Sequence, residues 1–148
     1  MARWLFKEEP SHYAFSDLER DGATVWDGVE NALALKHLRS VEAGDEILFY
    51  HTGKEKAVVG IMTALDSAAA GPEGGVRVRV APVQRLGRPV TLRELKAEPD
   101  LAGWELLRLP RLSIIPVTAA VWRRVLALSR EKLPAALPSR LQRRKDSR

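Results

Sequence analysis

Valine and arginine alternate strictly between residues 76 and 80, and no other stretch of this chain limits its local structure as firmly. A period of two matches the two faces of a β-strand and does not match a helix. We therefore expect a half-buried strand here, with its valines toward the core and with Arg77 and Arg79 facing outward. The alternation therefore predicts that this part of the chain belongs to a β-sheet.

The remaining signals are short and show no repeated βαβ order. Segments rich in β-forming residues predict strands at residues 3–7, 46–51, 57–65 and 113–115. Capping-box patterns predict helices that begin at Ser16, Asp27 and Thr91, and an amphipathic helix is expected from Thr118. Residues 68–75 are small and turn-forming, which favours a loop. The predicted class is α+β, a small curled sheet or barrel flanked by short helices.

The second capping-box pattern has consequences for function, because it overlaps a candidate site. Asp27 is the expected N-cap and Glu30, three residues later, completes the box. The helix is expected to continue to about Ser40. Asp27 would then stabilise the helix by about 1 kcal/mol, a role compatible with a place in a polar pocket wall.

Length and composition restrict the class of protein. The chain has 148 residues, enough for one domain with a proper core, and it has no cysteine, which excludes disulfides and thiolate metal sites. No apolar run approaches the roughly 20 residues of a membrane-spanning helix. We expect a cytoplasmic protein with no membrane contact, no metal and no other cofactor.

The charge favours an anionic partner. The net charge is +5, and clustered basic residues attract phosphate groups and release counterions. Much of the excess lies in Arg140, Arg143, Arg144, Lys145 and Arg148. We therefore expect a folded domain at residues 1–130, followed by a basic, proline-interrupted tail at residues 131–148, which is a solvated chain end.

Five ordered blocks of sequence resemble EVE domains. They lie at residues 4–10, 26–31, 44–52, 89–96 and 111–118, and Trp122 follows at the family's spacing. The resemblance covers residues 3–128. EVE domains are similar in fold to PUA and YTH domains, so the resemblance implies a PUA-like fold, a small β-barrel flanked by helices.

The chain departs from the family pattern at two of these blocks. Glu8 stands where the family usually has serine, and residues 30–35 read Glu-Asn-Ala-Leu-Ala-Leu where it usually has Arg-Asn-Tyr-Gln-Ala-Arg. The loop at residues 67–75 is shorter than usual and lacks the common Tyr-Pro-Asp element. The replaced residues are of the kind that stack on bases and hold phosphates, so the resemblance implies the fold more strongly than the ligand.

The resemblance implies a non-catalytic nucleic-acid-binding module that reads a modified base of the cytosine or adenine type. Such a module takes the base out of the stack, covers its face with aromatic rings and reads its edge with polar groups. The expected pocket residues are Trp26, Asp27, Gly28, Asn31, Tyr50, His51, Thr52 and Trp4. Residues expected at the rim or on phosphates are Lys7, Glu8, Arg39, Arg111 and Ser113.

Several alternatives stay open at this point. Trp4 alternates with Phe6 on a strand and is as well suited to the core as to a pocket. An enzyme is a second reading, because Lys7, Thr52 and Glu8 are similar to residues that ASCH-type proteins use for amide hydrolysis on acylated cytidine. A protein-interaction module that uses the basic tail is a third. DNA, RNA and free nucleoside are all possible ligands, and protein partners are unassigned.

Overall fold

Two parallel strands form the centre of the sheet. In the computed structural model, which describes residues 1–71 and 74–131, β1 (Arg3–Glu8) pairs in parallel with β3 (Glu46–His51). The register places Phe6 beside Phe49 and Lys7 beside Tyr50. Because the strands are parallel, their carboxyl ends meet at one edge of the sheet.

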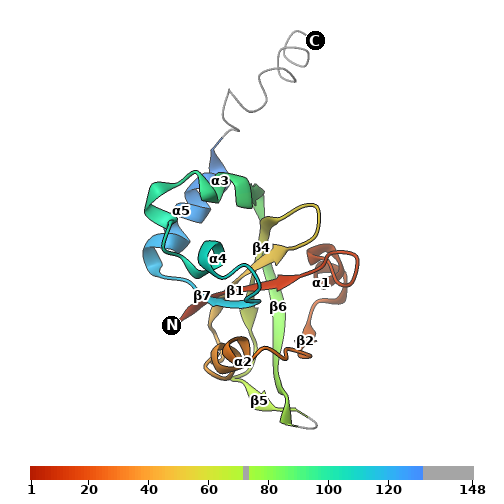
Figure 1. Ribbon diagram of the computed structural model, residues 1–148. Helices are drawn as coiled ribbons and strands as arrows, with labels where there is room; N and C mark the ends of the chain where they lie inside the picture. The colour runs from red at the N-terminus through yellow and green to blue at the C-terminus, as the bar shows by residue number, and fades with distance from the viewer. Residues whose placement is uncertain (72–73, 132–148) are drawn as a thin grey trace.

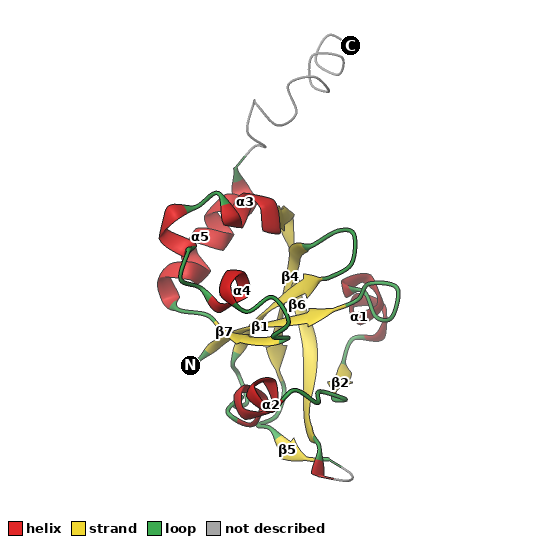
Figure 2. Ribbon diagram, in the orientation of Figure 1, coloured by secondary structure: helices red, strands yellow, loops and turns green. Residues whose placement is uncertain are grey.

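The other strands extend this pair into a curled, mixed sheet. These strands are β2 (Thr24–Trp26), β4 (Ala57–Ala64), β6 (Val76–Thr91) and β7 (Ile114–Pro116). The order is β2-β6-β4-β3-β1-β7, with the short β5 (Ala69–Ala70) paired to β6, and every pair except β1–β3 is antiparallel. Figure 2 shows the sheet as a half-barrel with helices around it. This confirms the predicted fold class.

Short helices cover the sheet. They are α1 (Phe15–Asp21), α2 (Ala32–Arg39), α3 (Leu92–Lys96), the 3₁₀ helix η2 (Pro99–Leu101), α4 (Glu105–Arg108) and α5 (Ala119–Arg130). In Figure 1, α3, α4 and α5 gather at one end of the sheet, whereas α2 lies toward the other end, near β5. Within the described ranges, no helix has the length and apolar character needed to cross a membrane.

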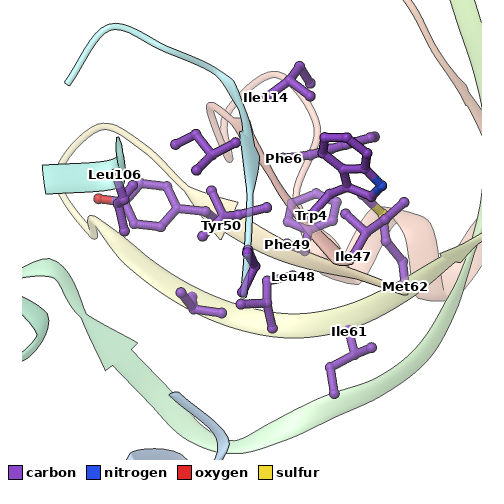
Figure 3. Close-up of a cluster of buried hydrophobic side chains, with 14 of the residues drawn as sticks. Trp4, Phe6, Ile47, Leu48, Phe49, Tyr50, Ile61, Met62, Leu106 and Ile114 are labelled. Carbon is purple, nitrogen blue, oxygen red and sulfur yellow. The ribbon is translucent and has the colours of Figure 1, made fainter. Parts of the chain in front are cut away.

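Aromatic rings fill one side of the core. Trp26 packs against Phe6 and Phe49 with ring centroids 5.3 and 5.4 Å apart, and Phe15 meets Phe49 edge to face. Figure 3 shows Tyr50 directed toward Leu106 of α4, away from the rings of Trp4 and Phe6. Burial of each such ring contributes about 1.5–3 kcal/mol to folding.

Two of the three predicted capping boxes are wrong. Helix α1 begins at Phe15, where the Asp17 carboxylate accepts from the Ala14 backbone N–H (2.8 Å), and Ser16 lies inside the helix. Helix α2 begins only at Ala32, with Asn31 as its N-cap. The chain turns at Gly28, whose φ of +74° suits glycine, so the helix cannot start at Asp27.

The third box and the last helix are confirmed. Thr91 and Glu94 form a reciprocal capping box at the start of α3, and Thr118 caps α5. Strand β6 is much longer than the predicted residues 76–80. It continues past Pro82 and Pro89, because irregular register with β4 lets a strand contain residues that lack a backbone N–H.

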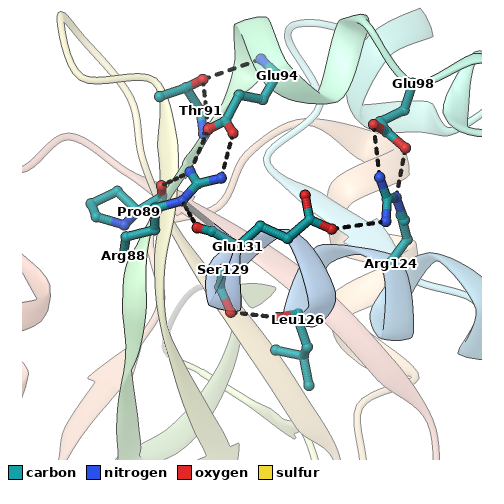
Figure 4. Close-up of polar contacts among 9 residues, drawn as sticks. All are labelled: Arg88, Pro89, Thr91, Glu94, Glu98, Arg124, Leu126, Ser129 and Glu131. Carbon is teal, nitrogen blue, oxygen red and sulfur yellow. Dashed lines mark hydrogen bonds and ion pairs between the residues drawn. The ribbon is translucent and has the colours of Figure 1, made fainter. Parts of the chain in front are cut away.

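Arginine–carboxylate pairs attach α3 to β6 and α5 to the residue before η2. Arg88 of β6 binds both oxygens of Glu94 (2.8 and 2.7 Å) and also donates to the Glu131 carbonyl after α5 (Figure 4). Arg124 of α5 binds Glu98 through two nitrogens, at 2.6 and 3.1 Å. The predicted tail lies outside the described residues, apart from Glu131.

Candidate functional site

The carboxyl ends of β1 and β3 carry the first group of polar residues. Lys7 Nζ donates to the Pro110 carbonyl (2.9 Å) and lies 5.7 Å from the centre of the Tyr50 ring. Together with Thr52 they line a hollow of about 270 Å³, which we call the lysine hollow. The rest of its lining is Gly53, Lys56, Leu92, Lys96, Leu106 and Pro110. Burial lowers the pKa of Lys7 and raises that of Tyr50 to about 12.

Glu8 and His51 face the other side of the sheet. His51 Nε2 accepts from the Phe15 backbone N–H (3.0 Å), and His51 Nδ1 lies 2.7 Å from a Glu55 carboxylate oxygen. A backbone N–H can only donate, so Nε2 carries no proton and Nδ1 carries it. The imidazole therefore holds the start of α1 against β3. Glu8 contacts His12, with 2.9 Å between Oε2 and Nδ1.

The two candidate tryptophans lie in the core. Trp26 is 6% exposed and is enclosed by Phe6 and Phe49. Trp4 is equally buried, and its indole N–H donates to Asp45 (2.9 Å). Successive strand residues point to opposite faces, so Trp26 packs on one face of the β1–β3 pair and Tyr50 lies on the other. The structure does not join Trp26 and Tyr50 in one cleft.

A second hollow, of about 620 Å³, lies between the segment before α2 and the start of β6. We call it the carboxylate hollow. Its lining is Asp27, Gly28, Val29, Glu30, Leu35, Gly71, Gly74, Gly75, Val76 and Arg77. Within residues 1–71 and 74–131, neither Asp27 nor Glu30 forms an ion pair. Two exposed carboxylates therefore face this hollow with their acceptor oxygens available.

A third hollow, of about 310 Å³, is lined partly by residues that belong to or adjoin those of the other two. We call it the arginine hollow, and it is lined by Asn31, Leu33, Arg108, Leu109, Pro110, Arg111 and Leu112. It shares Pro110 with the lysine hollow, and its Asn31 directly follows Glu30 of the carboxylate hollow. The three hollows thus follow one another along the molecule.

The remaining rim candidates lie close to these hollows. Arg39 lines a smaller hollow of about 250 Å³ that shares Gly74, Gly75 and Val76 with the carboxylate hollow. Ser113 accepts through its backbone carbonyl from the Lys7 N–H (3.0 Å). Asn31 uses Oδ1 to cap α2, which leaves its amide N–H groups available.

The residues of the enzyme alternative are not brought together. Lys7 and Thr52 share the lysine hollow, but Glu8 follows Lys7 directly on β1 and points to the opposite face, toward His12. The nearest carboxylate oxygen to the Thr52 hydroxyl belongs to Glu9, at 3.5 Å. In the part of the chain that the structure describes, no group of three His, Asp or Glu residues could hold a metal ion.

Four basic residues that line these hollows escaped the sequence prediction. Arg77 and Arg108 are exposed and line the same hollows as predicted site residues. Their basic charge is the sequence signal that could have identified them as candidate phosphate ligands. Lys56 precedes β4 and Lys96 ends α3, 40 positions apart in the numbering. Only the docking of α3 on the β4–β6 pair brings them into one hollow.

Comparison with known proteins places these features in a family. A profile of the EVE domain family matches residues 2–128. Human thymocyte nuclear protein 1 is 33% identical over 79 residues, which cover 45% of this chain and 35% of that protein. The chain thus matches about a third of the length of this relative.

Solved structures resemble the chain over most of its length. A protein of Rhodopseudomonas palustris is 35% identical, with a TM-score of 0.83 over 87% of this chain and 93% of that one. Human THYN1, solved in complex with DNA that contains 5-methylcytosine, is 26% identical, with a TM-score of 0.83 over 89% of this chain and 99% of that one.

Proposed function

This chain belongs to the EVE domain family, and from that premise we propose that it binds nucleic acid and holds one modified base, of the cytosine or adenine type, without acting on it chemically. The complex of human THYN1 with DNA containing 5-methylcytosine supports this assignment. The proposal covers DNA and RNA. We place the base in the carboxylate hollow and the strand across the arginine hollow.

The confinement of the carboxylates to one of two neighbouring hollows carries the proposal. Asp27 and Glu30 line the first hollow together with Arg77, whereas Arg108 and Arg111 line the next. Carboxylates repel phosphate but accept hydrogen bonds from the exocyclic amino groups that cytosine and adenine carry. Arginine binds phosphate through paired N–H donors, which positions a strand without reading its sequence. One surface therefore offers both kinds of contact.

The volume of the carboxylate hollow also suits a base. At about 620 Å³ it falls within the range of small-molecule sites, roughly 300–1,000 Å³. Gly28 turns the chain at its edge, and the backbone there is free of side chain. A base lifted out of its stack can enter and present its edge to Asp27 and Glu30.

Matched oligonucleotides test this assignment directly. 5-Methylcytosine and thymine differ at ring positions 3 and 4. In 5-methylcytosine N3 accepts and the 4-amino group donates, whereas in thymine N3–H donates and the 4-keto group accepts. We expect a single strand with one central 5-methylcytosine to bind more tightly than the same strand with thymine, by about 1–3 kcal/mol. Asp27→Asn and Glu30→Gln should each reduce this difference, measured by fluorescence anisotropy.

Asp100→Asn is the matched control, because Asp100 is an exposed carboxylate on η2, outside the three hollows. It should leave the preference for the amino-bearing base unchanged. If both hollow variants retained the full preference, the base would have to be read elsewhere. If no strand bound at all, the nucleic-acid assignment itself would fail.

A further inference from the structure

The lysine hollow lies beyond the proposed base site and has a different chemistry. We propose that it binds a phosphate monoester, as found at the phosphorylated end of a nucleic-acid strand. The inference rests on the proposed function only for the identity of the molecule that carries the phosphate. The site itself is argued from the residues that line it.

Three lysines from separate elements line this hollow, and its lining includes no acidic residue. Lys7 comes from β1, Lys56 from the residue before β4, and Lys96 from the end of α3. In the described ranges none of the three forms an ion pair. Like charges repel at close range, so the arrangement favours a ligand of high negative charge. A monoester carries about −1.5 to −2 at neutral pH, more than a backbone diester.

Hydrogen-bond donors in the hollow match phosphate oxygens. Lys7 Nζ donates one N–H to the Pro110 carbonyl. This hydrogen bond fixes the ammonium group and leaves two N–H donors for a ligand. Burial raises the pKa of Tyr50 to about 12, so its hydroxyl keeps its proton at neutral pH and can donate. Thr52 supplies a second hydroxyl, which lies 3.5 Å from Glu9 Oε1 and would turn from that carboxylate to donate to a phosphate. Charge-assisted bonds of this kind are about twice as strong as neutral ones.

The backbone at Lys56 gives an independent indication. Lys56 has a φ of +47°, the one positive value for a non-glycine residue in the described part of the chain. In this conformation an ordinary side chain strains the backbone, whereas glycine adopts it without that strain. The Lys56 carbonyl accepts from the Leu92 N–H (2.7 Å), which ties the β3–β4 connection to α3. Glycine would fit this backbone position without strain, so the presence of lysine there indicates that its ammonium group binds an anion.

The test compares one oligonucleotide with and without a terminal phosphate, at the 5′ end and at the 3′ end in turn. We expect the phosphorylated strand to bind about tenfold more tightly at one of the two ends. Lys56→Gln and Lys96→Gln should each remove most of that difference. Lys54→Gln is the matched control, because Lys54 lies in the same connection but does not line the hollow.

A second variant separates binding from folding. Lys56→Gly should be at least as stable as the parent protein, because it relieves the strained backbone, and it should still lose the preference for phosphate. Inorganic phosphate alone, followed by NMR at the Thr52 amide, tests the site without any strand.

Equal affinity for both strands would overturn the inference and leave the base-binding proposal standing. If Lys54→Gln reduced the preference for the phosphorylated strand as much as the hollow variants do, the inference would also fail. The preference would then follow from the net charge of the protein and not from this hollow. Binding of inorganic phosphate at Thr52 without binding of any strand would support the site and contradict the proposed function.

Discussion

At the scale of single residues, the backbone of the short segment between β2 and α2 determines which polar side chain caps α2 and which line the carboxylate hollow. Asn31 takes the capping position, with Oδ1 2.9 Å from the Ala34 N–H. Asp27 and Glu30 are thereby released from any helix and face the carboxylate hollow. Glu30 was expected from the sequence to stabilise α2. In the structure Glu30 is instead an exposed charge that lines the carboxylate hollow.

Glu30→Arg tests this local reading. Because Glu30 does not cap α2, we expect the free energy of unfolding to change by less than about 0.5 kcal/mol, measured by urea denaturation. Affinity for a single-stranded oligonucleotide should rise by up to about 1 kcal/mol, more at low salt than at high salt. The preference for 5-methylcytosine over thymine should fall in the same variant. Unchanged or weaker strand binding by the folded variant would contradict a polymeric ligand at this hollow.

At the scale of elements, each helix start depends on one side chain and its exact backbone position. The α2 start was predicted four to five residues too early, because Asp27 and Glu30 have the spacing of a capping box. Local spacing cannot reveal that Gly28 bends the chain away from helical geometry. The α3 start was predicted correctly, because Thr91 continues an extended strand directly into the helix.

Paired alanine substitutions distinguish the two candidate caps of α2. Asn31→Ala should lower the free energy of unfolding by about 1 kcal/mol, because the Ala34 N–H loses its acceptor. Asp27→Ala should change it by less than about 0.5 kcal/mol. Urea denaturation followed by circular dichroism measures both. A larger loss in Asp27→Ala than in Asn31→Ala would contradict the observed helix start.

The strands show the same division between what sequence can and cannot predict. The strands at residues 3–7 and 46–51 follow from local composition, and both are confirmed. Their parallel pairing does not follow from composition, and it is the pairing that places Lys7 beside Tyr50. Trp26 was predicted to line the base pocket. Its burial depends on Phe6 and Phe49, which only the assembled sheet brings to it.

At the scale of the whole molecule, arginine–glutamate pairs join α3 to the sheet and α5 to the residue before η2. Burial alone would raise the pKa of Glu94, but hydrogen bonds from Arg88 and Thr91 outweigh it and hold the pKa below its ordinary value of 4.5. A hydrogen bond from Arg124 lowers the pKa of Glu98. Both carboxylates thus bind protons less readily in the folded protein than in the unfolded chain.

Acid should therefore weaken the fold through these two groups. Their contribution is fully present above the unfolded-state pKa and is lost as the pH falls through the lower folded-state values. We expect the free energy of unfolding, measured in urea from about pH 7 to about pH 3, to fall less steeply below about pH 5 in a Glu94→Gln, Glu98→Gln double variant than in the parent. Parallel profiles for the two proteins would show that other carboxylates control acid unfolding.

The position of β1 between β3 and β7 has a consequence for how the chain folds during synthesis. Of these three strands β1 is synthesised first, and its neighbours lie at residues 46–51 and at residues 114–116. Contacts that are this distant in sequence raise the contact order and slow folding. Until the last strand emerges, one edge of β1 has no partner and is exposed to chaperones and to other nascent chains. Of the three strands, β1 is thus made first and acquires its second neighbour only when β7 has been made.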